Sequence, residues 1–241
     1  MKDYFYFCFR GSWQLCIQVL HCLATGELLD LSQQQLVSCA RSSGNGCQGG
    51  WPWKALDYIH ETGVCSSSDY PYTLGNTKQD GTCNNSCNNK KLSIGATIDI
   101  QGESALQSAL DNQAVQVVVE AGNNVWKNYK SGVVRQCPGA QSDLAALAVG
   151  YGTANGVQHF KIKNSWGTVW GEQGYIYLQR GVGGKGMCNA AEHPLFPKID
   201  KQPSPHPSSN VPKPSTDKPQ PTNKPKPTSK NPALSTKAPS N

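Results

Sequence analysis

Apolar side chains recur at spacings of three and four near the start of the chain, which is the period of one helix face. The residues that carry this pattern are Phe9, Trp13, Cys16, Leu20 and Leu23. The pattern predicts a mostly buried helix over residues 9–23. The Thr25-Gly26 pair that follows predicts its end.

Two further helices are predicted from their end signals. Ser32 with Gln35 three positions later is typical of a capping box, in which each side chain bonds the backbone of the other residue, and predicts a helix over residues 33–39. Pro52 is typical of a first helical position and Gly63 of the residue after a last turn, so they mark the ends of the second helix.

The pattern changes in the second half of the chain. After a short helix near residues 104–110, β-branched and aromatic residues gather in short runs separated by glycines, as in strands. These runs cover residues 115–120, 144–149, 160–163 and 175–178. A helical half over residues 1–101 and a β-rich half over residues 102–197 predict an α+β protein with a cleft between the halves.

The composition changes again at residue 198. Residues 198–241 hold eleven of the sixteen prolines, eight lysines, two aspartates and almost no apolar side chains, so this segment cannot bury a core. We expect a disordered tail rich in Pro, Ser, Thr and Lys, which acts as a solvated stalk, an O-glycosylated spacer or a cationic adhesive segment. No partner of the tail follows from its sequence.

The formal net charge of +6 belongs to this tail, because removing its eight lysines and two aspartates leaves 14 basic and 14 acidic residues in the rest of the chain. A neutral globular part argues against nucleic acid as a partner. No stretch reaches the ~18 uninterrupted apolar residues that a membrane-spanning helix needs. The apolar run over residues 4–9, which Arg10 interrupts, is not a convincing signal peptide. We expect a monomer.

Ten cysteines spread from residue 8 to residue 188 are many for a reducing compartment and indicate a disulfide framework. The sequence has no C-x-x-C or H-x-x-x-H pair of the kind that holds zinc, so we expect no metal and no cofactor. A secreted or endolysosomal location follows, and the sequon Asn84-Asn85-Ser86 supports it.

Five segments resemble landmarks of the papain-like cysteine peptidases and occur in the family's order. Residues 163–176, KNSWGTVWGEQGYI, resemble the signature around the family's catalytic asparagine and are the most specific match. The other segments are residues 32–39, 46–53, 69–72 and 148–152. The resemblance covers about residues 23–197. It implies a papain-like fold, with a helical half, an antiparallel β-barrel-like half and a peptide-binding cleft between them.

The family's chemistry uses a cysteine thiolate as nucleophile, a histidine that takes and returns the proton, and an asparagine that orients the imidazole. By resemblance Asn164 is the asparagine, Trp166 is the tryptophan that shields it, and Leu144 stands at the position of the histidine. Leucine cannot accept a proton. Losing one member of such a set costs about four to six decades in rate, or about 5–8 kcal/mol. The resemblance therefore implies a catalytically inactive chain.

The other histidines are not expected to replace the missing one. His159 lies five residues before Asn164 on the same predicted strand, and an odd separation puts two side chains on opposite faces. His21 and His60 belong to the helical half, and His193 to the final segment.

The nucleophile position is degenerate as well. An ungapped count back from Thr25-Gly26 places Cys8 at the family's cysteine, although the surrounding motif is lost. If Gly11-Ser12-Trp13 is instead the remnant of that motif, the nucleophile is missing. Lys2 stands where the family has the glutamine of its oxyanion hole, and the chain begins too late for the family's first strand and pro-segment. One alternative is an active endopeptidase in which residues 1–22 come from a faulty gene model.

The substrate cleft is better kept than the catalytic set. By resemblance Gly49 and Gly50 offer the bare backbone along which an extended peptide pairs. The apolar pocket for the side chain two residues before the cleaved bond is formed by Trp51, Pro52, Val118 and Ala145. A peptide or protein, as substrate or inhibitor, is thus the expected partner. A non-catalytic peptide- or inhibitor-binding module is the second alternative.

The resemblance implies two disulfides and leaves two further cysteines that depart from the family and could pair with each other. The two pairs implied by the resemblance are Cys39 with Cys83 and Cys137 with Cys188. The two further cysteines are Cys65 and Cys87. Phe5 stands where the family has the partner of Cys47. Cys47 is therefore either unpaired or bonded to Cys8, which would then not be a nucleophile.

Overall fold

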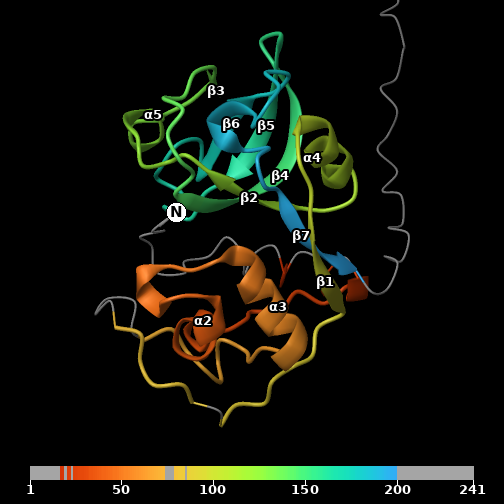
Figure 1. Cartoon of the computed structure of the whole chain (residues 1–241), viewed down its shortest axis with the longest axis vertical. Coiled ribbons are helices and arrows are strands. Elements are labelled where there is room, and N and C mark those ends of the chain that lie inside the picture. The colour runs from red at the N-terminus through yellow and green to blue at the C-terminus, as the bar shows by residue number, and fades with distance from the viewer. Residues whose placement is uncertain (1–16, 19–20, 23, 74–78, 85, 200–241) are drawn as a thin grey trace, which may run out of the picture. The chain divides into compact units, whose positions relative to one another are not determined.

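A computed structural model of the chain describes residues 17–18, 21–22, 24–73, 79–84 and 86–199. The predicted nucleophile Cys8 and all but the first two residues of the predicted tail 198–241 lie outside the described residues. In the described part, helices α2 and α3 lie in the first half of the sequence and most strands in the second (Figure 1). The mixed α+β architecture agrees with the expectation from sequence.

Helix α2, Gln33–Cys39, begins as its cap predicts, because Ser32 Oγ accepts the N–H of Gln35 at 3.1 Å. The second bond of the capping box does not form. Gln35 instead accepts the N–H of Cys65 at 2.7 Å and donates to Asn89 Oδ1 at 2.8 Å. The glutamine side chain therefore ties two later segments of the chain to the helix.

Helix α3, Pro52–Thr62, has proline at its start and ends at Gly63, whose φ of 80° suits glycine. Two 3-10 turns, η1 over Arg41–Ser43 and η2 over Gly46–Gln48, connect α2 to α3. Of the first predicted helix, residues 17–18, 21–22 and 24–25 are helical, and Gly26 donates to the Cys22 carbonyl at 2.7 Å. The rest of that helix lies outside the described residues.

Seven strands form one sheet in the order β1-β7-β2-β4-β5-β6-β3. They are β1 Ile94–Asp99, β2 Val115–Val119, β3 Val133–Val134, β4 Leu144–Ala154, β5 Val157–Lys163, β6 Tyr175–Gln179 and β7 Leu195–Ile199. All neighbours are antiparallel except β3 and β6. The sheet is open, with β1 and β3 at its edges, whereas the resemblance implied a barrel-like half.

Three strands were not predicted from the sequence, namely β1, β3 and β7. β1 lies within the range expected for the helical half, and β7 extends two residues into the range expected for the tail, because Ile199 pairs with Ile94. The short helices are α4, Glu103–Leu110, close to its expected place, and α5, Asn124–Lys127. No helix in the described ranges is long and apolar enough to cross a membrane.

Two apolar clusters form the core. The larger one lies on the inner face of β2, β4, β5 and β6 and includes Trp126 and Phe160. The smaller one gathers α2, α3 and the described part of the first helix around Leu36, Leu56 and Ile17, and it includes Ile94 of β1 and Leu195 of β7. β1 and β7 therefore connect the helical half to the sheet.

Disulfides join distant segments of the described chain. The pairs are Cys39–Cys83, Cys65–Cys87 and Cys137–Cys188, which are those the sequence suggested. Cys47 is also disulfide-bonded, so the alternative that Cys47 is unpaired is wrong. Among the described cysteines only Cys22 is free.

Candidate functional site

Asn164 directly follows β5 and is almost buried, with 6% of its surface exposed. Its N–H donates to the Gly174 carbonyl at 2.9 Å, which fixes the backbone where the strand ends. Its side-chain Oδ1 accepts the N–H of Ser165 at 2.7 Å. The Nδ2 group is buried and has no hydrogen-bond partner among the described residues. A buried amide with an unused donor is costly, by about 1–3 kcal/mol.

Three tryptophans form a cluster that includes two residues of the segment after Asn164. The Trp166 ring stands edge-on to Trp170, with centroids 5.2 Å apart, and to Trp126 at 6.4 Å. Trp170 stacks on Trp126 at 5.8 Å and donates its Nε1–H to the Trp126 carbonyl at 3.0 Å. The cluster holds the segment after Asn164 against the core. Trp126 was missed because it lies on a four-residue helix with no periodic pattern of its own.

Leu144 is the first residue of β4 and lies opposite Val119 of β2. Both side chains belong to the larger core cluster. The preceding residue, Asp143, locks the start of the strand, because its carboxylate accepts the N–H groups of Ala121 at 2.7 Å and Gly122 at 2.8 Å. The site thus holds an apolar side chain on a firmly anchored backbone.

The register of the sheet relates Leu144 to Asn164. Lys163 of β5 pairs with Leu147 of β4. In an antiparallel pair, one step forward on β5 corresponds to one step back on β4, so Asn164 lies opposite Ala146. Residues directly opposite each other share a face, and positions two apart on one strand share a face. Leu144, Ala146 and Asn164 are therefore on the same face at the same end of the sheet.

The four histidines of the described chain have other surroundings, and none of them is hydrogen-bonded to Asn164. His159 is on β5 and stands edge-on to the Tyr177 ring at 4.8 Å. Its neighbour Phe160 faces the core, so the alternation along β5 places His159 and Asn164 on opposite faces, as predicted. The remaining contacts are His60 Nδ1 with Ile94 O at 2.8 Å, His21 Nε2 with Glu27 at 3.6 Å and His193 Nδ1 with Asp99 at 3.6 Å.

The predicted peptide-pairing segment lies between η2 and α3. Asn45 donates to the Gly49 carbonyl at 2.8 Å, and Trp51 donates to the Ser43 carbonyl at 2.7 Å. Gly50, between these two bonds, uses neither its N–H nor its C=O in a hydrogen bond with the described residues. It is partly exposed. The loop therefore presents the backbone donor and acceptor of one residue, Gly50, without a partner among the described residues.

Asp80 anchors this loop from a distant part of the sequence. Its carboxylate accepts the N–H of Cys47 at 2.6 Å and pairs with Arg41 at 2.7 Å. Burial by itself raises the pKa of Asp80, but the Cys47 N–H and the Arg41 guanidinium outweigh it, so the pKa is lowered from its usual value of 3.8. Sequence analysis missed Asp80 because 33 residues separate it from Cys47.

The predicted apolar pocket residues come from both halves. Val118 lies opposite Ala145 where β2 and β4 pair, and both side chains are on the face away from Leu144. Pro52 is buried at the start of α3, and the Trp51 ring lies 4.9 Å from that of Trp53. Their joining into one pocket stays a prediction.

A different hollow of about 570 Å³ lies in the helical half, lined by residues 28–31, 64, 66, 68–69 and 88–90. It contains none of the predicted site residues. No cluster of three or more His, Cys, Asp or Glu side chains suited to a metal ion occurs in the described part of the chain.

The family described as papain family cysteine protease matches residues 8–198. The chain belongs to the papain family. Members of this family are cysteine-type peptidases, a class of hydrolases, and the order of landmarks found in the sequence is explained by this descent.

Relatives of this papain-family chain occur among plant proteases. Cysteine proteinase COT44 of Brassica napus is 37% identical over 195 residues, which are 79% of this chain and 58% of the relative. Germination-specific cysteine protease 1 of Arabidopsis thaliana is 36% identical over 197 residues, 79% of this chain and 51% of the relative. The chain therefore spans about half the length of these relatives.

Two solved structures have the same fold and are complexes with the inhibitor E-64. The Carica candamarcensis cysteine protease CMS1MS2 is 34% identical, with a TM-score of 0.70, over 79% of this chain and 87% of that structure. The bromelain protease of Ananas comosus is 34% identical, with a TM-score of 0.70, over 78% of this chain and 86% of that structure. These matches establish the papain-like fold.

Proposed function

We propose that this papain-family chain does not hydrolyse peptide bonds, and that its loop around Gly50 still binds extended peptides. The single observation that carries the first part is Leu144, an apolar core residue on the sheet face and at the sheet end that it shares with Asn164. A papain-type reaction needs a base there to take the thiol proton and return it to the leaving amine.

The surroundings of Asn164 support the loss of activity. Its Oδ1, the atom that would orient an imidazole, accepts a backbone N–H from Ser165. The histidines of the described chain have contacts of their own, so none is in position as a substitute. Without a base, a thiol with a pKa near ~8.5 stays mostly protonated at neutral pH.

The N–H and C=O groups of Gly50, which have no partner among the described residues, support retained peptide binding. An extended peptide laid against this residue would gain two backbone hydrogen bonds, as in strand addition. Two solved structures with the same fold are complexes with E-64, so the family's fold is compatible with binding a small inhibitor. We infer a peptide or a protein inhibitor as the partner.

Turnover of a fluorogenic peptide with an apolar residue two positions before the cleaved bond tests the first part. We expect no turnover above the blank for purified chain whose mass confirms Leu144. Turnover by such material would refute the proposal. The variants Leu144→His and Leu144→Gln, assayed side by side, test whether Leu144 alone prevents turnover. Activity in the histidine variant but not in the glutamine variant would mean that the nucleophile is intact.

Fluorescence anisotropy with a labelled peptide of the same sequence tests the second part. The variant Gly50→Pro removes the N–H donor, whereas Gly50→Ala retains both backbone groups. We expect the proline variant to bind at least about tenfold more weakly than the alanine variant, the cost of about 1.4 kcal/mol for one hydrogen bond. Equal affinities in two variants that unfold at the same temperature would show that the peptide does not pair with Gly50.

A further inference from the structure

The sequence has one Asn-X-Ser/Thr sequon without proline in the middle, formed by Asn84, Asn85 and Ser86. Neither the proposed loss of activity nor the peptide-binding loop uses these residues. Such a tripeptide occurs by chance in many proteins, so it needs structural support before it carries an inference.

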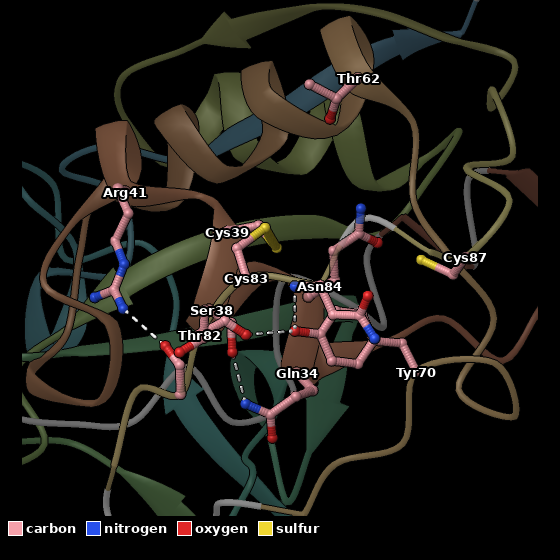
Figure 2. The surroundings of a disulfide bond; sticks show 12 residues. Gln34, Ser38, Cys39, Arg41, Thr62, Tyr70, Thr82, Cys83, Asn84 and Cys87 are labelled. Carbon is pink, nitrogen blue, oxygen red and sulfur yellow. Dashed lines mark hydrogen bonds between the residues drawn. A yellow bond between two sulfur atoms is a disulfide. The ribbon is translucent and has the colours of Figure 1, made fainter.

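Asn84 and Ser86 are both exposed. Asn84 Oδ1 accepts the N–H of Ser86 at 3.0 Å, and the Asn84 N–H donates to the Tyr70 hydroxyl at 3.2 Å. Figure 2 shows Asn84 beside Tyr70, next to the Cys39–Cys83 disulfide. The residue is therefore held through its backbone and its side-chain oxygen.

The groups that a glycosyl transfer would use are unoccupied. Neither Asn84 Nδ2 nor Ser86 Oγ forms a hydrogen bond with a described residue. The Asn84 side-chain oxygen bonds the backbone of its own chain, while its nitrogen, on an exposed residue, has no bond to a described residue that would hold it. A sugar attached at this nitrogen would replace no contact of the folded protein.

We propose that Asn84 is a site of N-glycosylation. In the reaction Nδ2 attacks the anomeric carbon of an oligosaccharide carried by a polyprenyl pyrophosphate. The N–C bond forms, the bond between that carbon and the pyrophosphate oxygen breaks, and the polyprenyl pyrophosphate leaves. The amide nitrogen loses one proton to a base of the transferase, and nothing is oxidised or reduced.

The disulfides place the chain in a compartment where this transfer can occur. Cys39–Cys83 and Cys65–Cys87 end on either side of the sequon, at the residue before Asn84 and the residue after Ser86. Disulfides of this kind persist in the oxidising secretory pathway, where N-glycosylation also takes place. The disulfides and the sequon in this segment are therefore both consistent with passage through the secretory pathway.

The test is translation of the full chain behind a cleavable leader in the presence of microsomes. We expect the chain that becomes protected from added protease to show one step of lower gel mobility, which an N-glycosidase removes. Asn84→Gln and Ser86→Ala should each lose the step completely, whereas Ser86→Thr should keep it. Asn88→Gln, in the same segment but outside any sequon, is the matched control and should also keep it.

Two results would overturn the proposal. One is a protease-protected wild-type chain without the mobility step, because the sequon was then offered to the transferase and not used. The other is a step that persists in Asn84→Gln. Both results are independent of peptidase activity and peptide binding.

Discussion

Leu144 lies directly opposite Val119 where β4 pairs with β2, and the two side chains pack together in the core below the sheet. Leu144 is the residue predicted to replace the family's histidine, and in the fold its side chain serves core packing. Leu144 has only 6% of its surface exposed, so its substitution should lower the stability of the fold.

Truncating this side chain should destabilise the fold. Leu144→Ala removes a buried branched side chain and leaves a cavity, so we expect the free energy of unfolding to fall by about 2–4 kcal/mol. Urea unfolding followed by fluorescence measures this loss. Val149→Ala, at a residue of the same strand that is 36% exposed, is the control and should cost less than about 1 kcal/mol. Equal losses in both variants would contradict the packing of Leu144.

The stability that Asp80 gives to the loop around Gly50 should depend on pH. Asp80→Asn weakens the ion pair with Arg41 and the bond from the Cys47 N–H, at a cost of about 1–2 kcal/mol at neutral pH. Because the pKa of Asp80 is lowered in the folded chain, its stabilising effect is complete above the unfolded value of 3.8. It is lost as the pH falls through the folded value.

Urea unfolding of wild type and Asp80→Asn at pH 7, 5, 4 and 3 checks this prediction. The difference between the two should stay constant down to about pH 5 and then shrink. Asp57→Asn, which affects a carboxylate that accepts a bond from Thr97 in another part of the chain, is the comparison. A difference that grows on acidification would have the wrong sign for a lowered pKa.

The hydrogen bond from the Trp170 side chain to the Trp126 carbonyl should contribute to the stability of the fold. Trp170→Phe keeps most of the ring contact with Trp126 but deletes the Nε1–H donor to the Trp126 carbonyl. We expect a loss of about 1–3 kcal/mol in the free energy of unfolding, from the lost bond and the smaller ring. Calorimetry measures it. Trp53→Phe, at a side chain that is 37% exposed, should leave the unfolding temperature nearly unchanged.

The disulfide that departs from the family should contribute to stability. Replacing Cys65 and Cys87 together by serine opens a loop with a sequence separation of 22 residues. The chain-entropy estimate for such a loop is about 3 kcal/mol. Urea unfolding of the double variant checks the value, and a loss below about 1 kcal/mol would mean that Gln35 and its bond to the Cys65 N–H hold this segment without the crosslink.

Much of the fold follows from local signals in the sequence. Ser32, Pro52 and Gly63 are at the helix ends they predicted, because capping and turn chemistry depend on a few neighbouring residues. β4 continues past its predicted end to Ala154, although Gly150 and Gly152 interrupt the apolar run. The long hairpin with β5 supplies backbone bonds that offset the weak strand preference of glycine.

What escaped prediction depends on contacts between distant segments. β7 contains Pro197 and Lys198 and has no clear alternation, and its pairing with β1 and β2 makes it a strand. In the candidate site, resemblance to the family predicted Asn164 and the glycine loop as site residues. The anchoring roles of Asp80 and Gln35 became visible only in the folded chain, since no local pattern marks a long-range hydrogen bond.

The position of β7 between β1 and β2 has a consequence for biosynthesis. This strand pairs with β1, about a hundred positions earlier, and also with β2. The sheet therefore cannot be completed while Leu195 is still inside the ribosome, and the earlier strands must wait with unpaired edges. A stop codon just before residue 195 would release a chain in which β1 and β2 lack the strand that pairs with both.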